Sequence, residues 1–144
     1  RNVVFNEMHK PFAAYALSEA EMAKWGVVET LRDDVNAVLE AARAQKKIGK
    51  SLEAHITLVR AQDQADNLTA LQEKFQDQWA DLFIVSKVDL TEGEGGVKGI
   101  VEGLGAAATH AAGNKCLRCW KQAKSVGSDA AHPALCARCA KVVG

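Results

Sequence analysis

The sequence contains no apolar run close to the roughly 18 residues that a membrane-spanning helix needs, which excludes a transmembrane protein. Its first residues, RNVVFNEMHKPF, lack the basic and apolar stretches of a secretory signal, so we expect a cytoplasmic chain. They also lack an initiator methionine, which suggests a piece of a longer protein. The formal net charge is zero, with 18 basic and 18 acidic residues, which argues against a protein that coats nucleic acid by bulk electrostatics.

Glycine motifs that bind phosphate are absent or lack their usual context. The pattern G-x-x-x-x-G-K-[ST] does not occur. The stretch 103–108, GLGAAA, fits the dinucleotide pattern G-x-G-x-x-G/A, but no helix of useful length is predicted between it and Cys116. That motif needs a helix N-terminus that faces the pyrophosphate, so we reject a nucleotide site. We interpret residues 93–113 as turns with two weak strands, around 97–101 and 106–111.

The zero net charge hides an asymmetry along the chain. Residues 113–144 hold six basic side chains and one acidic side chain, a net charge of +5. The first 112 residues hold 12 basic and 17 acidic side chains, a net charge of −5. The basic end is either a chance cluster of solubilising charges or a reason to look for an anionic partner there.

The spacing of apolar residues predicts a long helix from residue 18 to about residue 48. Ser18-Glu19-Ala20-Glu21 fits a capping box, in which the two outer side chains satisfy amides of the first turn. Basic residues near the far end suit the helix dipole, and Gly49 can take the left-handed conformation that ends a helix. The apolar residues that share one face are Trp25, Val28, Leu31, Val35, Val38, Leu39 and Ala42.

The pattern then changes to period two, which predicts a half-buried strand over residues 52–58. His55 lies on the polar side of this strand, where we expect it to be solvated or hydrogen-bonded rather than a ligand. Residues 82–85, LFIV, indicate a buried strand. A second helix is predicted before them, capped by Asp66 or Asn67, with an apolar face formed by Leu68, Leu71, Phe75 and Trp79.

The cysteines are the strongest functional signal. All four lie in the last 29 residues, as two C-x-x-C pairs separated by 16 residues: Cys116 and Cys119, then Cys136 and Cys139. Each pair places two sulfurs on one tight turn, and four thiolates complete a tetrahedral zinc site with no position open to water. The zinc is therefore expected to be structural. Two disulfides would suit a secreted chain, and His110 or His132 could replace one sulfur, but the spacing favours four cysteine ligands.

These elements predict an α+β fold with a long N-terminal helix, a small mixed helix and strand domain, and a C-terminal four-cysteine zinc ribbon or knuckle. The boundaries are predicted at residues 1–49, 50–112 and 113–144. The last part is too small to build a core, so the ion should hold it together. Trp120, directly after Cys119, is expected to pack over the knuckle; the alternative is a face on which a base stacks.

The cysteine strings GNKCLRCW, at 113–120, and HPALCARC, at 132–139, resemble the C-terminal zinc finger of bacterial-type isoleucyl-tRNA synthetases. Trp25 and residues 31–43 and 48–54 are similar to the end of that family's anticodon-binding helical domain and its entry into a small α/β domain. The string Phe83-Ile84-Val85-Ser86 also fits the family. The resemblance covers nearly the whole chain, and the glycine-rich stretch departs from it most.

This resemblance implies that the chain is the C-terminal region of an ATP-dependent ligase that charges isoleucine tRNA. The chain itself holds neither of the two class I signature motifs and no editing domain. The three parts would be the end of the anticodon-binding domain, a junction domain and the zinc finger. Their implied role is to grip tRNA near the anticodon stem, so that a remote catalytic core is productively loaded. The implied partners are isoleucine tRNA and the upstream part of the enzyme, in a monomer with no membrane contact. The candidate RNA-binding residues are Lys115, Arg118, Trp120, Lys121, Arg138 and Lys141.

Two other functions fit part of the pattern. DNA-repair glycosylases carry a related four-cysteine finger, in which an arginine just before the second C-x-x-C reaches the DNA backbone. Here that stretch, residues 130–135, reads AAHPAL and contains no arginine. A zinc ribbon can also serve as a protein-interaction adaptor without nucleic acid. Binding assays with tRNA and duplex DNA separate the three functions.

Overall fold

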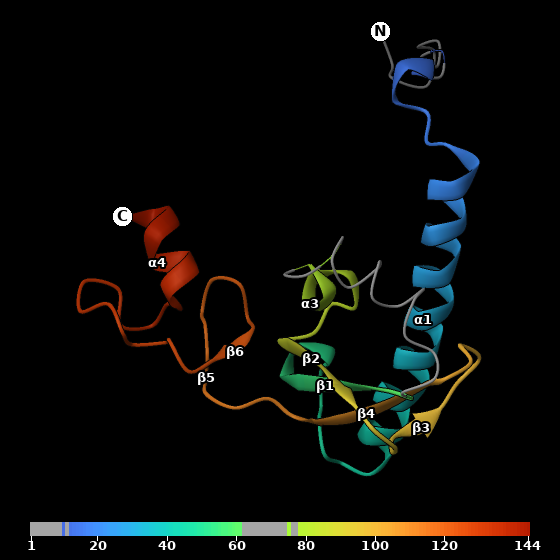
Figure 1. The fold of residues 1–144 in the computed structure, drawn as a ribbon. Helices are drawn as coiled ribbons and strands as arrows, with labels where there is room; N and C mark the ends of the chain where they lie inside the picture. The colour runs from blue at the N-terminus through green and yellow to red at the C-terminus, as the bar shows by residue number, and fades with distance from the viewer. Residues whose placement is uncertain (1–9, 11, 62–74, 76–77) are drawn as a thin grey trace, which may run out of the picture.

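The computed structural model describes residues 10, 12–61, 75 and 78–144. A long helix packs on a four-stranded sheet with a short helix beside it, and a small C-terminal module follows (Figure 1). The predicted α+β class and long N-terminal helix are confirmed. The elements are α1 (Glu19–Ala44), β1 (Ala54–Arg60), α3 (Trp79–Leu82), β2 (Lys87–Glu92), β3 (Val97–Lys98), β4 (Leu104–His110), β5 (Asn114–Lys115), β6 (Gln122–Ala123) and α4 (Ala137–Val143).

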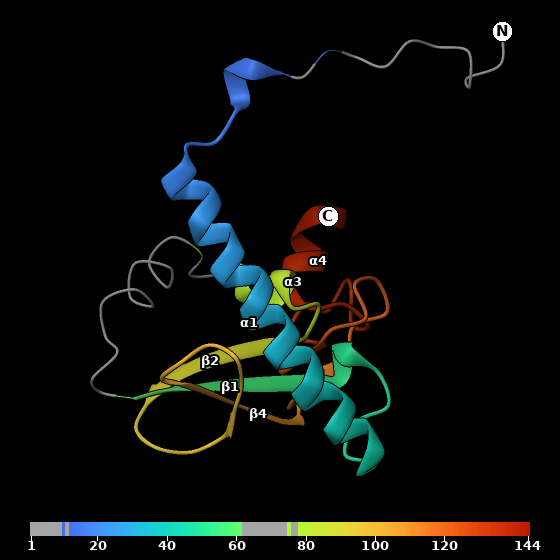
Figure 2. The same cartoon turned by 90° about the vertical axis from the view of Figure 1, so that its right-hand side faces the viewer.

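The sheet has the strand order β2-β1-β4-β3. β1 runs parallel to β2 and antiparallel to β4, and Ile56 is in register with Val88 on one side and Ala108 on the other. α1 crosses one face of the sheet (Figure 2), and both contribute to one apolar core. Alternate residues of β1, among them Ala54 and Leu58, are buried in this core. We call α1, α3 and the sheet the body, and residues 113–144 the module.

α1 begins and packs as predicted. The Ser18 hydroxyl accepts a hydrogen bond from the Glu21 N–H at 3.3 Å, and the Glu21 carboxylate accepts one from the Ser18 N–H at 3.1 Å, so the capping box is confirmed. The two reciprocal bonds satisfy amides that have no partner inside the helix. The buried face agrees with the predicted one, with Trp25 half-buried and the following residues buried: Val28, Leu31, Val35, Val38, Leu39 and Ala42.

The predicted end of this helix is wrong. α1 stops at Ala44, well before Gly49, and Lys46 takes the left-handed conformation with φ of 58°. The Lys47 N–H then donates to the Ala42 carbonyl at 3.0 Å, which satisfies a carbonyl of the last helical turn. This closure usually uses glycine, so a lysine in that place gives no sequence signal.

β1 begins two residues later than predicted, because Ser51–Glu53 form one turn of 3-10 helix. Its alternation of buried and half-buried residues agrees with the prediction. The half-buried His55 places its Nε2 2.9 Å from the carboxylate of Asp89 on β2. It is therefore hydrogen-bonded, as expected.

The strand predicted at residues 82–85 is wrong. α3 extends into this segment, and the remaining residues form the turn that closes the helix. Ile84 takes a left-handed φ of 55°, and the Val85 N–H donates to the Ala80 carbonyl at 2.9 Å. Phe83 and Val85 are nevertheless buried, so the apolar run reports burial without a strand.

The helix predicted from Asp66 or Asn67 lies mostly outside the described residues. Where the structure describes its far end, the Phe75 and Trp79 rings meet edge-on with centroids 5.6 Å apart. Phe75 also meets Trp25 of α1 at 5.1 Å. These aromatic residues therefore join α3 to the helix that covers the sheet.

The loop between β2 and β4 is fastened to α1 by a buried carboxylate. Asp34, 9% exposed, accepts hydrogen bonds from the N–H groups of Ile100 at 2.8 Å and Val101 at 3.0 Å. Gly99 approaches so closely that a Cβ there would lie 2.1 Å from the Asp34 carboxyl carbon. Of the two weak strands predicted in this stretch, the one around 97–101 is present only as the two residues of β3, and the one around 106–111 is present as β4. Residues 104–108 of the glycine motif lie in β4 and not in a helix.

The body and the module have separate cores, and the core of the module surrounds the cysteines. Within the body, α1 shares its core with the sheet. The predicted boundaries at residues 49 and 112 stay predictions. Among the helices of the described residues, none is both long enough and apolar enough to cross a membrane.

Candidate metal centre and nucleic-acid interface

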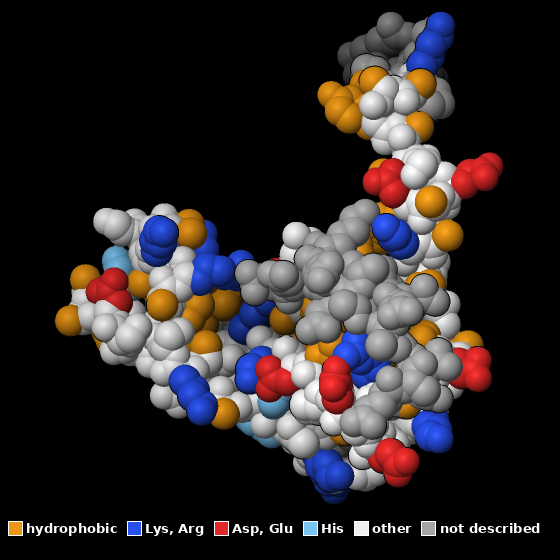
Figure 3. All heavy atoms as spheres, in the orientation of Figure 1, with side chains coloured by type: hydrophobic (Ala, Val, Ile, Leu, Met, Phe, Trp, Pro, Cys, Tyr) orange, Lys and Arg blue, Asp and Glu red, His pale blue; other side chains and the backbone are white. Residues whose placement is uncertain are grey.

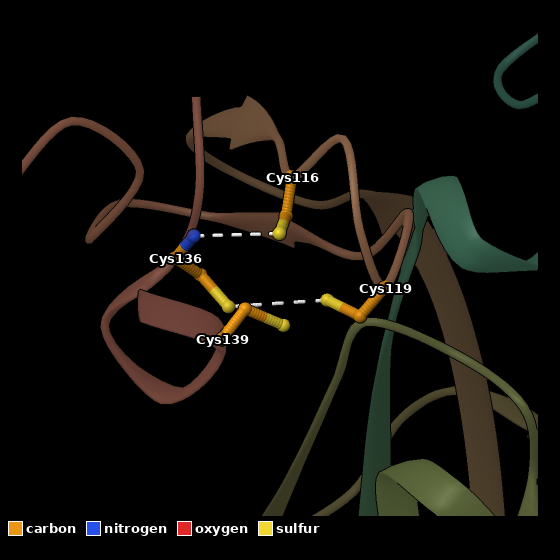
Figure 4. A group of neighbouring side chains, drawn as sticks. All are labelled: Cys116, Cys119, Cys136 and Cys139. Carbon is orange, nitrogen blue, oxygen red and sulfur yellow. Dashed lines mark hydrogen bonds between the residues drawn. The ribbon is translucent and has the colours of Figure 1, made fainter. Parts of the chain in front are cut away.

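The module presents its cysteines on two tight turns. The first pair lies between β5 and β6, where the Cys116 N–H donates to the Lys121 carbonyl and the Trp120 N–H donates to the Cys116 carbonyl, both at 2.9 Å. The second pair lies at the start of α4, where Cys136 directly precedes the helix and Cys139 lies in its first turn. Figure 4 shows the side chains of the two pairs directed toward one another.

The four sulfur atoms converge within 4.8 Å of one another. The Sγ atoms of Cys119 and Cys136 are 3.8 Å apart (Figure 4). A tetrahedral zinc ion with Zn–S bonds of about 2.3 Å separates its sulfurs by about 3.8 Å, so the spacing fits this ion. All four cysteines are free thiols; three are buried and Cys119 is half-buried. A fourfold sulfur site leaves no position for a water molecule, which gives the metal a structural role.

The protein environment prepares the sulfurs for a cation. The Cys136 N–H donates to the Sγ of Cys116 at 3.3 Å (Figure 4). Burial raises the pKa of Cys116, but hydrogen bonds from the N–H groups of Cys119, Cys136 and Arg118 outweigh it and lower the pKa to about 6. Burial and contacts with the other thiols raise the pKa of Cys136 to about 11. One thiol therefore ionises readily, while its neighbour keeps its proton until a cation neutralises the cluster.

Two arginines neutralise the sulfurs from outside. Nη1 of Arg118 lies 3.8 Å from the Sγ of Cys139. The pKa of Arg138 is raised, chiefly by its hydrogen bond to the Cys119 sulfur and further by the charges of Cys139 and Asp81. Four thiolates around Zn²⁺ carry a formal double negative charge, which the two guanidinium groups balance. Both arginines are candidate RNA-binding residues, and part of their charge is committed to the metal centre.

Trp120 was expected to pack over the knuckle, but the residue is 61% exposed, so this expectation is wrong. Its backbone is left-handed, with φ of 65°. Nζ of Lys115 lies 5.7 Å from the centroid of the Trp120 ring, within the range of a cation–π contact. Together these two candidates form an exposed aromatic surface beside a positive charge, a combination on which a nucleic-acid base can stack next to its phosphate.

The remaining cations of the module differ in their surroundings. Lys121 forms an ion pair with Asp81 of α3, and its side chain is only 21% exposed. Lys141 is exposed on α4. Sequence reasoning did not select Lys124, which is exposed directly after β6; its only signal was membership of the basic C-terminal cluster. Figure 3 shows Lys and Arg side chains on the visible face of the module, while the acidic side chains lie mostly on the body.

Comparison with known proteins identifies the module and the rest of the chain separately. Residues 113–142 match the family described as the zinc finger found in FPG and IleRS. This match and the four converging sulfurs agree on a single structural zinc site. The predicted cofactor is thereby confirmed.

Similarity to full-length proteins extends beyond the finger. The chain is 42% identical to the isoleucine–tRNA ligase of Thermotoga neapolitana over 114 residues, which are 79% of this chain and 12% of the relative. It is 40% identical to that of Geobacter sulfurreducens over 132 residues, covering 87% of this chain and 13% of the relative. The ligase of Thermosynechococcus vestitus is 40% identical over 147 residues, covering 94% and 15%. The chain spans about an eighth of the length of these curated relatives. The chain therefore belongs to the isoleucine–tRNA ligase family, as a segment that carries the family's zinc finger.

Proposed function

We propose that this chain is a tRNA-binding segment of an isoleucine–tRNA ligase, a cytoplasmic enzyme that uses ATP to join isoleucine to its tRNA. The observation that carries the proposal is the charge of the metal module, which holds six basic and one acidic residue beside a body of opposite net charge. The module attracts a polyanion and the body repels it, so charge alone directs RNA to one end of the molecule.

The zinc supplies no reaction chemistry in this role; when bound, it joins the two turns of the module. Its ligands in the proposal are the four sulfurs that converge: Cys116, Cys119, Cys136 and Cys139. Because the turns contribute few apolar residues of their own, the ion replaces the core that so short a segment lacks. The metal thereby fixes the positions of the exposed side chains that surround it.

The exposed cations form the RNA contacts in this proposal. Lys115, Lys124 and Lys141 are exposed, and Trp120 offers its ring beside Lys115. Arg118 and Arg138 are also exposed, but they direct charge at the sulfurs as well. RNA held here contributes binding energy from a part of the substrate remote from the reacting end, which an enzyme can use to orient that end.

The beginning of α1 supports a second partner, the upstream part of the same enzyme. The buried residues of α1 begin at Val28, and the chain before it exposes apolar side chains at Tyr15, Leu17 and Met22. Figure 1 shows this part of α1 extending beyond the sheet. The relatives are several times longer than this chain, so we assign the exposed apolar surface to contacts with the preceding part of the ligase.

The binding preference of the zinc-loaded chain tests this proposal. Filter binding or fluorescence anisotropy would compare isoleucine tRNA, a non-cognate tRNA and duplex DNA of equal charge. We expect weak binding that favours tRNA over duplex DNA, and weaker binding by the zinc-free chain. Equal or tighter binding of duplex DNA would favour the DNA-repair function, and no binding of any nucleic acid would favour a protein-interaction adaptor.

The ligase activity itself is expected to need parts outside this segment. The sequence holds neither class I signature motif, so no site for ATP is predicted in it. Isoleucine-dependent pyrophosphate exchange by the purified chain should stay at background. Exchange above background, in a preparation free of host ligase, would contradict the assignment as a binding segment.

A further inference from the structure

The module is fastened to the body at α3 and at the turn that follows it, before β2. Nζ of Lys121 pairs with the carboxylate of Asp81, and the backbone N–H of Gln122 donates to the hydroxyl of Ser86 at 2.6 Å. Two neighbouring residues of the module thus contact one residue of α3 and one residue of the turn after it. We call these four residues the latch.

The body side of the latch is itself rigidly held. The Ser86 hydroxyl donates to the Leu52 carbonyl at 2.5 Å, and the Ser86 N–H donates to the Ala54 carbonyl at 3.1 Å. Ser86 therefore joins the 3-10 turn and the start of β1 to the module. Its hydroxyl both donates and accepts, which fixes the direction of the bond to Gln122.

The covalent connection between the two parts is short and lies at a different place from the latch. Ala111 is buried, and its N–H donates to the Glu53 carbonyl at 2.7 Å, so the body extends to this residue. Gly113 then takes φ of 101°, and a Cβ there would lie 2.2 Å from the carbonyl carbon of Ala123. A connection at one point allows a module to pivot, and a second attachment removes that freedom.

We propose that Asp81 and Ser86 are positioning residues, which hold the module in one orientation against the body. They thereby fix the direction in which RNA bound to the module extends from it. The orientation follows from the contacts of the body and module alone; its use in tRNA binding rests on the proposed function. The latch withdraws Lys121 from RNA and assigns it to the interface between the two parts.

The chemistry of the latch makes it separable from folding. A single ion pair with an exposed carboxylate is weak. Here the covalent connection keeps the module close to the body, and the neighbouring hydrogen bond from Gln122 to Ser86 adds a directional contact. Neither Asp81 nor Lys121 belongs to the buried core of the body or to the cysteine cluster. Their substitution should therefore change the orientation of the module without removing its zinc.

Residual dipolar couplings of the zinc-loaded, ¹⁵N-labelled chain test the latch directly. In the unaltered chain, couplings from the sheet and from the module should fit one alignment tensor. In Asp81→Asn/Ser86→Ala, the couplings of the module should shrink and require a tensor of their own, while zinc content stays at one per chain. The exposed Asp33→Asn on α1 is the matched control for the loss of one carboxylate and should behave as the unaltered chain.

A second set of variants keeps Ser86, so its result does not depend on whether Ser86→Ala unfolds the chain. Asp81→Lys and Lys121→Asp should each release the module, and the two together should restore a single tensor, because the ion pair forms again with its charges exchanged. A single tensor for Asp81→Asn/Ser86→Ala, two tensors for the unaltered chain, or no recovery in the exchanged pair would overturn the proposal. Isoleucine tRNA binding is measured in parallel: its absence in the unaltered chain defeats the proposed function and leaves the orientation result standing.

Discussion

Nη1 of Arg118 lies 3.8 Å from the Sγ of Cys139, so a candidate RNA-binding residue faces the metal centre instead of solvent alone. A sulfur that carries negative charge is stabilised by a guanidinium group at this distance. The same contact places a positive charge at the surface of the module. One arginine can therefore serve the metal and a polyanion, and the two roles can be separated by measurement.

Removal of this charge should loosen the zinc. In Arg118→Met, transfer of zinc to a chromogenic chelator should be faster, because residues around metal ligands commonly change affinity by about 10-fold to 100-fold. Lys124→Met removes the same charge from an exposed residue of the same module and is the matched control. Equal release rates in both variants would show that Arg118 acts only through net charge.

Loss of the metal should unfold the module and spare the body. Cys136→Ser removes one of four converging ligands, so residues from about 113 onward should lose their dispersed amide resonances, because the ion replaces a core there. The body has its own apolar core, and its sheet should persist. Zinc analysis and amide spectra of the same sample check this. Collapse of the sheet along with the module would contradict separate cores.

Zinc affinity should rise with pH. The pKa of Cys136 is raised to about 11, so this thiol is protonated at neutral pH and must release a proton when zinc binds. This group alone predicts about a tenfold gain in affinity per pH unit near neutrality. The pKa of Cys116 is lowered to about 6, so its proton competes with zinc only below that pH, where the dependence should steepen. Chelator competition from pH 5.5 to 8.5 measures the slope; an affinity independent of pH would contradict this account.

The buried carboxylate of α1 should matter for the stability of the body. In Asp34→Asn only one oxygen remains to accept from the N–H groups of Ile100 and Val101, so we expect a loss of about 1–3 kcal/mol in the free energy of unfolding. Asp33→Asn changes the exposed neighbour and should alter the free energy of unfolding by less than about 0.5 kcal/mol. Urea unfolding followed by circular dichroism compares them. Equal stabilities would mean that the loop does not depend on Asp34.

Local patterns in the sequence predicted the elements that local chemistry determines. The Ser18–Glu21 capping box, the alternation of β1 and the two C-x-x-C turns each depend on residues a few positions apart. The left-handed residues Lys46 and Ile84 escaped prediction, because neither side chain favours that conformation, which here accompanies the backbone hydrogen bonds that close α1 and α3.

The roles of the charged residues could not be read from the sequence for a different reason. Lys121 and Asp81 are 40 positions apart, and only the placement of the module against α3 brings them together. In the same way, spacing alone does not show whether Trp120 is buried. From the sequence we expected packing over the knuckle, whereas the residue is exposed. The zinc site was predictable because all four ligands lie on two short turns.

The salt dependence of binding to isoleucine tRNA tests the central claim, that exposed cations of the module contact RNA. Each phosphate contact releases counterions, so two to four contacts predict a log–log slope of about −1.5 to −3.5 for the zinc-loaded chain. Lys115→Glu/Lys124→Glu should bind more weakly with a flatter slope and keep its zinc, whereas Lys24→Glu/Lys98→Glu, which reverses two exposed lysines of the body, should change both much less. If the module variant keeps its zinc and binds with the affinity and slope of the unaltered chain at every salt concentration, the module is not the RNA site.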